Sequence, residues 1–208
     1  MKNFLAIDTS GNYMSVVAVK NGEAFSTFLP DCAMSHSVLL METVDEVLAR
    51  AKMRLDECDF FAAAVGAGSF TGIRIGISAA KGFALATGKP TLGVTSFDVL
   101  AYNAIGGKRL CLINASHDCY YACGYENGEV VYPPTFLTEA EVLALSEKGF
   151  TLVAGAPLPI ALKIAVQTVS PVEGLQNAVL ALSEKAEAFG ELTALYVRKS
   201  SAEINLCK

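Results

Sequence analysis

Two stretches of this 208-residue chain combine polar side chains and glycines in a way that suits contact with a phosphate group or a metal ion. The first is Asp8-Thr9-Ser10, at the end of an apolar run. A carboxylate beside hydroxyl groups offers the oxygen ligands that hard cations prefer, but the same residues also close turns by bonding to their own backbone. The second is Gly68-Ser-Phe-Thr-Gly72. At both stretches the residues alone leave a phosphate site and a plain turn open.

The glycine-rich stretch joins an expected strand to an expected helix. Residues 60–65 form a short, continuous apolar run, which is typical of a strand buried on both faces, and apolar residues recur at helical spacing after Gly72. Ser69 or Thr71 can cap that helix. Free N–H groups at a helix start also bind anions, but a single glycine-rich turn is weak support for a phosphate site. No Gly-Lys-Ser/Thr follows, so the stretch is not a Walker loop.

The elements that position these stretches predict an α/β fold. Strands are expected over 3–9, 14–19 and 23–29, and their short connections make them antiparallel neighbours. The next expected elements are a helix over 36–53, the strand 60–65, a helix over 72–86, a strand over 91–94 and a helix from Ser96 to about 104. Antiparallel strands extended by parallel ones through helical crossovers predict the ribonuclease-H-like half of actin and Hsp70 ATPases.

The pattern restarts after residues 106–108. Strands are expected over 110–113, 120–125, 129–132 and 150–154, with a chain break at Pro133-Pro134 and a helix capped by Thr138. We interpret this as a degenerate second copy of the same unit. The predicted domains are therefore 1–105 and 106–208, and a helix over about 175–190 is expected to return to the first half. The second copy's loop, 114–118, has Asn114 where a carboxylate would help and has no glycine, which weakens an ATPase interpretation.

Composition excludes several classes of protein. The net charge of −5 argues against a self-sufficient nucleic-acid binder. The two histidines are far apart, so a catalytic zinc or iron site is poorly supported, and the six cysteines, without a C-x-x-C pair, indicate reduced and mostly buried thiols. No apolar run reaches the roughly 18 residues of a membrane span, and an acid follows the N-terminus too soon for a signal peptide. We expect a cytoplasmic protein that does not enter the membrane.

The helices expected over 36–53 and 72–86 have features of a protein interface. The first is apolar over a wider arc of its surface than packing against a single core would cover. The second carries small residues at spacings of three and four, which let another helix approach closely; a position sandwiched inside the chain's own fold is the alternative. The residues nominated as partner contacts are His36, Leu40, Met41, Val44, Arg74 and Ile75. Arg74, in the first turn of a helix, opposes the helix dipole, so we expect it to pair with a carboxylate of this chain, a partner's carboxylate or an RNA phosphate.

The glycine-rich stretch, followed by Arg74 and Gly76, resembles the G-P-G-S-F-T-G-x-R-x-G signature of the TsaB (YeaZ) family, with Ala67 in place of the usual proline. The match is dense over residues 4 to about 100 and thin from there to about 190. Further blocks agree in order: Leu5–Ser10, His36-Ser37, Ala80–Gly82, Gly93–Ser96, and Tyr196 with Arg198.

The resemblance implies a bacterial protein of tRNA threonylcarbamoyladenosine synthesis that is a non-catalytic paralogue of TsaD. It implies binding to TsaD, homodimers when the chain is alone, work alongside the ATPase TsaE of the same pathway, and contact with tRNA only through the complex. TsaD would hold the metal and transfer the threonylcarbamoyl group to adenosine 37. We assign this chain no catalytic residue, no metal ligand and no firm cofactor. Weak ATP or ADP binding is assigned to Asp8, Thr9, Ser10, Gly68, Ser69, Thr71 and Gly72.

Other functions stay open at this point. One is a small ATP-dependent phosphotransferase or carbamoyl transferase of the actin-like class, which would use Asp8 and the loop 68–72. Another is a glycopeptidase, the activity once ascribed to the family, for which the metal ligands are missing. A self-assembling structural module is the last. Of these, the accessory, non-enzymatic subunit is the interpretation that the sequence favours.

Overall fold

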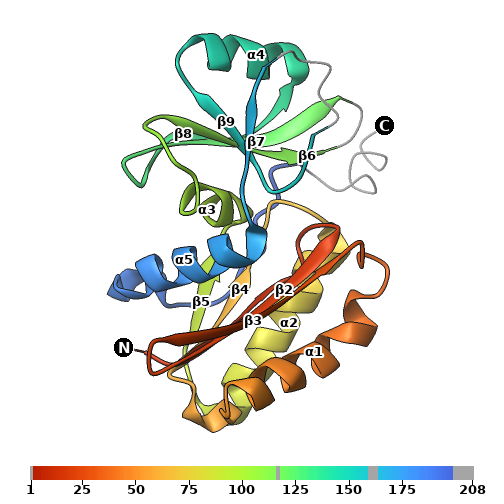
Figure 1. The fold of residues 1–208 in the computed structure, drawn as a ribbon, viewed down its shortest axis with the longest axis vertical. Helices are drawn as coiled ribbons and strands as arrows, with labels where there is room; N and C mark the ends of the chain where they lie inside the picture. Colours follow the sequence, from red (N-terminus) through yellow and green to blue (C-terminus); the bar gives the residue numbers. More distant parts are fainter. Residues whose placement is uncertain (1, 116–117, 159–163, 199–208) are drawn as a thin grey trace.

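The computed structural model describes residues 2–115, 118–158 and 164–198, and it has two lobes, each built on a five-stranded sheet (Figure 1). The strand order is β3-β2-β1-β4-β5 in the first sheet and β8-β7-β6-β9-β10 in the second. In each sheet the first three strands of that order are antiparallel and the others are parallel. The second lobe therefore repeats the first, and the predicted fold of two ribonuclease-H-like halves is confirmed.

The first lobe has helices on both faces of its sheet. Its elements are β1 (Phe4–Asp8), β2 (Tyr13–Lys20), β3 (Glu23–Pro30), α1 (His36–Arg50), β4 (Phe60–Ala64), α2 (Phe70–Thr87), β5 (Thr91–Val94) and α3 (Ser96–Ala101). Alternate residues of β1 point to opposite faces, so Leu5 and Ile7 pack with α1 and α2, while Phe4 and Ala6 pack on the other side. Burial on both faces explains why β1 and β4 are continuous apolar runs.

The helix α5 (Pro171–Ser183) covers that other face (Figure 1). Leu175, Ala178 and Val179 are buried there against Phe4 and Ala6 of β1 and their neighbours. The helix begins four residues earlier than we expected, because Ser170 caps it and Pro171 occupies its first turn. It ends at Ser183, and the residues Ala186–Ala188 form a separate 3₁₀ turn.

The second lobe consists of β6 (Arg109–Asn114), β7 (Cys119–Glu126), β8 (Glu129–Thr138), α4 (Glu139–Glu147), β9 (Thr151–Ala154) and β10 (Val166–Thr168). The expected break at Pro133-Pro134 is wrong, because β8 continues through both prolines. It lies at the edge of the sheet, and its pairing with β7 shifts register near this point, where prolines are tolerated. The capping box at Thr138 is confirmed.

Other boundaries also differ from the prediction. The helix expected over 36–53 ends at Arg50, shortly before Lys52 adopts a positive φ. Thr95, and not Ser96, caps α3. The described cysteines are free thiols, and burial raises the pKa of Cys58 to about 12 and that of Cys123 to about 11. None of the helices in the described ranges is long and apolar enough to cross a membrane.

Candidate functional site

The structure brings the two polar stretches of the first lobe into direct contact. The backbone N–H of Ser69 donates a hydrogen bond to the carbonyl oxygen of Ser10 at 2.7 Å. The hydroxyl of Thr9 donates to the carbonyl oxygen of Gly72, also at 2.7 Å. The loop after β1 is thus joined to the start of α2 by one backbone–backbone and one side chain–backbone hydrogen bond, at the carboxyl ends of adjacent parallel strands.

The glycines of the turn make this contact sterically possible. A Cβ atom at Gly72 would overlap the carbonyl oxygen of Thr9, and one at Gly68 would overlap that of Ser10. Gly68 also has a φ of +150°, which other residues rarely adopt. At Gly76 a Cβ would lie 2.7 Å from the hydroxyl oxygen of Thr9. Close backbone packing therefore accounts for the glycine pattern without a bound phosphate.

The serine and threonine of the turn have different surroundings. Ser69 caps α2, because its hydroxyl oxygen accepts a hydrogen bond from the backbone N–H of Gly72 at 3.2 Å. Thr71 is exposed and lines a groove on the outer side of α2, so it does not join Asp8, Thr9 and Ser10. The predicted phosphate set is thus split between two surfaces.

Asp8 is buried, and both of its carboxylate oxygens accept hydrogen bonds. Oδ1 accepts from the backbone N–H of Ser10 at 2.8 Å, and Oδ2 accepts from the hydroxyl of Tyr13 at 2.9 Å. Burial raises the pKa of Asp8, and the two hydrogen bonds oppose that shift without cancelling it. The carboxylate therefore takes part in the internal structure of the loop and has no contact with solvent.

The raised pKa of Asp8 makes the stability of the protein depend on pH. The unfolded chain loses this proton near the ordinary pKa of 3.8 and the folded chain loses it at higher pH, so ionisation of Asp8 disfavours folding as pH rises through this range. The Asp8→Asn variant has no carboxyl group at this position, so the free-energy cost of ionising it in the folded state is absent. We expect the melting temperature of the variant, relative to wild type, to increase as the pH rises from about 4 to neutral. Calorimetry across that range measures it, and a difference that stays constant or falls would contradict the burial argument.

A cleft of ≈ 800 Å³ lies between the lobes. Ser10, Tyr13, Gly68 and Ser69 line it from the first lobe, and Tyr121 is among the residues of the second lobe that do so. None of the described residues lining the cleft is a lysine or an arginine, and one is an aspartate, Asp31. Residues 116 and 117 of the predicted second-lobe loop, 114–118, lie outside the described residues. The described walls therefore provide no cation for the phosphates of a nucleotide.

A second hollow, which we call the α1–α2 groove, lies on the outer side of the first lobe. It has a volume of ≈ 600 Å³ and is lined by Ser37, Leu40, Met41, Phe70, Thr71, Arg74, Ile75, Ser78 and Ala79. Large apolar side chains are exposed in and beside it: Val38 is 76% exposed, Met41 46% and Phe70 40%. The structure therefore brings the predicted contacts Met41, Arg74 and Ile75 together on one surface.

The prediction of His36 and Val44 as surface contacts is wrong. Val44 is buried in the core between α1 and the sheet, and the buried His36 places Nε2 2.9 Å from the carbonyl oxygen of Tyr13. Leu40 is also buried, but it forms part of the groove wall. The inward face of α1 repeats every three or four residues from His36, so its outward face is the one that carries Met41.

Arg74 is bound by aromatic side chains of its own chain. Its Nε donates to the hydroxyl of Tyr196 at 2.9 Å, and its guanidinium carbon lies 3.7 Å from the centre of the Phe70 ring. The rings of Phe70 and Tyr196 stack with their centres 4.9 Å apart. The expected carboxylate of this chain is therefore not the partner of Arg74 among the described residues, where cation–π contacts stabilise this cation at the helix start. A partner's carboxylate or an RNA phosphate stays a prediction. Phe70 was not among the predicted contacts, and its sequence signal was an apolar aromatic in the first turn of a helix.

Comparisons with known proteins are consistent with this architecture. The model of the TsaD family, described as tRNA N6-adenosine threonylcarbamoyltransferase, matches residues 23–205. The tRNA threonylcarbamoyladenosine biosynthesis protein TsaB of Buchnera aphidicola is 34% identical over 100 residues, which are 48% of this chain and 47% of that protein. An uncharacterised protein of Mycobacterium tuberculosis is 30% identical over 172 residues, which are 82% of this chain and 79% of that protein.

The solved structures include YeaZ from Pseudomonas aeruginosa, which matches with a TM-score of 0.73 at 23% identity. The match covers 94% of this chain and 100% of that one, and at this identity it shows a shared fold. The aligned part of this chain spans about half the length of the curated TsaB relatives that it matches.

Proposed function

We propose that this chain, which belongs to the TsaD family described as tRNA N6-adenosine threonylcarbamoyltransferase, is a non-catalytic accessory subunit. It binds a catalytic TsaD-type paralogue and supports the transfer of a threonylcarbamoyl group to adenosine 37 of tRNA. The relatives named TsaB, whose names refer to biosynthesis of the same modified nucleoside, support this assignment. On this proposal the chain acts in the cytoplasm, where it meets tRNA through the complex.

The observation that carries the proposal is the exposed apolar surface of the α1–α2 groove. Met41, Phe70 and Ile75 contribute apolar surface, and Arg74 is held rigidly beside them by stacked rings. Exposed apolar side chains gathered around a groove mark protein interfaces, and an arginine among aromatic rings is a typical centre of binding energy. Acidic residues of α1, such as Glu42 and Asp45, lie exposed on the same helix and give the surface a polar rim.

The inter-lobe cleft gives less support to an enzyme. An ATP-dependent transferase that used Asp8 would need this carboxylate within reach of a bound metal–nucleotide, whereas it is buried and bonded to Ser10 and Tyr13. The described lining residues include neither lysine nor arginine. Among the described residues, no three or more His, Cys, Asp or Glu side chains lie close enough together to hold a metal ion. The described residues therefore give no support to a glycopeptidase.

The proposal is tested by mixing the purified chain with a purified TsaD-type paralogue and measuring molar masses by light scattering. On the proposal, the chain alone forms a homodimer through the α1–α2 groove. Adding the paralogue should convert it into a heterodimer, because both partners use the same surface. A chain that stays homodimeric or monomeric in the presence of excess paralogue would contradict the proposal. On the same proposal, TsaE is a further partner of the complex.

A further inference from the structure

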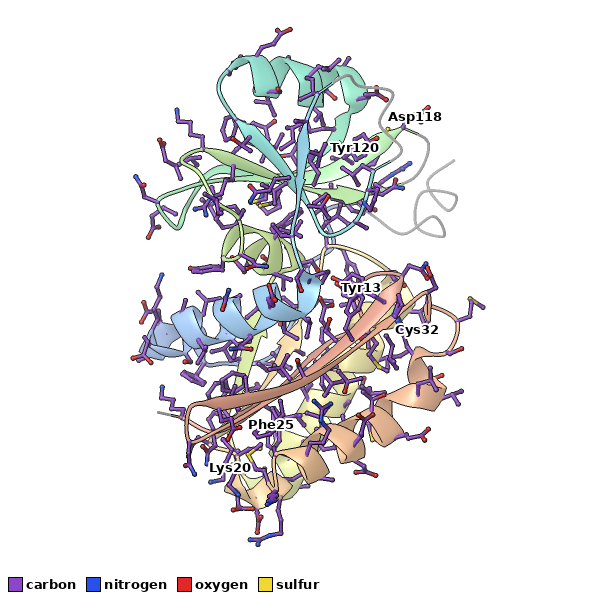
Figure 2. All side chains as sticks on the ribbon, viewed as in Figure 1. Tyr13, Lys20, Phe25, Cys32, Asp118 and Tyr120 are labelled. Atoms are coloured by element: carbon purple, nitrogen blue, oxygen red, sulfur yellow. The ribbon has the colours of Figure 1, made fainter. Side chains whose placement is uncertain are left out.

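Tyr13 separates the carboxylate of Asp8 from the cleft. The tyrosine lines the cleft, whereas Asp8 is buried behind it, and the hydroxyl of Tyr13 donates to Oδ2 of Asp8 at 2.9 Å. Figure 2 shows Tyr13 at the end of the first lobe that faces the second lobe. Its ring also packs against Phe28 of β3, with the ring centres 5.6 Å apart. The side chain is therefore fixed at both its ring and its hydroxyl.

The loop is shaped to hold the ring in this position. A Cβ atom at Gly11 would overlap Cε1 of Tyr13 and would lie 2.7 Å from Cδ1. Gly11 thus makes room for the ring to fold back over the loop toward Asp8. The neighbouring backbone N–H of Ser10 occupies the other carboxylate oxygen. This is a built arrangement, because a side chain at residue 11 would displace the ring.

This arrangement does not fit the metal ion that an actin-like nucleotide site uses. A hard cation needs carboxylate oxygens that face the ligand, and those of Asp8 face Tyr13 and Ser10. We propose that the Tyr13 hydroxyl takes the place of a divalent cation at Asp8 and so closes the first-lobe loop to metal-bound phosphates. Removing the Tyr13 side chain then opens an Asp8-dependent cation site. This inference does not rest on the accessory function.

The chemistry of the pair agrees with this role. Burial, together with the charge of Asp8, raises the pKa of Tyr13 well above its ordinary value. The phenol therefore stays protonated at neutral pH and continues to donate its hydrogen bond. A purely structural tyrosine would also stabilise the loop, but its removal would create no site for a cation. The two roles therefore differ in what they predict for metal binding.

The experiment measures Mn²⁺ binding by electron paramagnetic resonance, with and without ADP, for wild type, Tyr13→Ala, Tyr13→Phe and Tyr13→Ala with Asp8→Asn. Mn²⁺ is the probe because it prefers the same oxygen ligands as Mg²⁺. We expect Tyr13→Ala to bind Mn²⁺ about tenfold more tightly than wild type, a change within the range of about 10–100-fold that altering a hydrogen-bond partner of a metal-ligating group produces. Adding Asp8→Asn should return binding to the wild-type level.

Tyr13→Phe keeps the ring against Phe28 and removes only the hydroxyl, so it tests the same claim if the alanine variant does not fold. It should show a smaller gain, because the ring still restricts access. Circular dichroism melting establishes that each variant is folded. Mn²⁺ affinity equal to wild type in the folded Tyr13 variants, or a gain that persists with Asp8→Asn, would overturn the proposal. Asp8-dependent Mn²⁺ binding by wild type itself would also overturn it.

Discussion

Gly72→Ala is expected to lower the free energy of unfolding by at least about 3 kcal/mol, the upper range for overpacking a well-packed core. The added Cβ would overlap the carbonyl oxygen of Thr9 and would lie 3.3 Å from Nδ1 of the buried His36. The atom in the way is backbone of Thr9, whose hydroxyl is bonded to Gly72 and whose neighbour Ser10 accepts a hydrogen bond from the backbone N–H of Ser69, so it cannot move aside cheaply. Urea denaturation followed by circular dichroism measures the change.

Gly82→Ala is the matched control on the same helix. Gly82 is exposed, and a Cβ atom placed there has no atom within 4 Å. Because alanine is the better helix former, this variant should gain about 0.5–1 kcal/mol. If Gly72→Ala were as stable as Gly82→Ala, the glycines of the turn would not serve close packing. A phosphate role for them would then regain support.

Met41→Arg and Ile75→Glu are each expected to weaken binding to the TsaD-type paralogue by about 100-fold or more, the loss typical of central interface residues. Each variant puts a charge into the α1–α2 groove, where a bound partner would leave it desolvated and unpaired. Both side chains are at least partly exposed, so the monomer should keep its fold. Isothermal titration calorimetry with the purified paralogue measures the affinity.

Leu85→Arg is the control for this pair. Leu85 is 88% exposed near the C-terminal end of α2 and does not line the groove. The Leu85→Arg variant should bind the paralogue with the same affinity as wild type. Wild-type affinity in both groove variants would place the interface elsewhere, and an equal loss in Leu85→Arg would show that the effect is not local. Val44 is unsuitable for such a test, because a charge there would be buried in the core.

The sequence predicted the fold well because its signals are local. Asn21-Gly22 marks the turn between β2 and β3, and the continuous apolar runs mark β1 and β4, which are covered on both faces. The prediction of a chain break at Pro133-Pro134 was wrong because prolines are tolerated in an edge strand. That β8 lies at the edge is a property of the whole sheet and cannot be read from the local sequence. The start of α5 could have been predicted from Ser170 and Pro171.

The candidate site was less predictable. Helical spacing showed that α1 is apolar over a wide arc, but it could not decide which stripe faces out, so the buried Val44 was grouped with the exposed Met41. The ring contact between Arg74 and Tyr196 joins residues that are far apart in the chain. The contact between Tyr13 and Asp8 depends on a side chain folding back over a glycine. Such contacts follow from tertiary packing and leave no periodic signal in the sequence.

On the proposed function, this chain supports a catalytic paralogue without being the catalyst. The most direct test is a reconstitution from purified TsaD-type paralogue, TsaE, ATP, threonylcarbamoyl-adenylate and tRNA, with modified adenosine measured by mass spectrometry. We predict product only when the paralogue and this chain are both present, and none when this chain replaces the paralogue. Product formed by this chain without the paralogue, or formation that does not depend on this chain, would contradict the account.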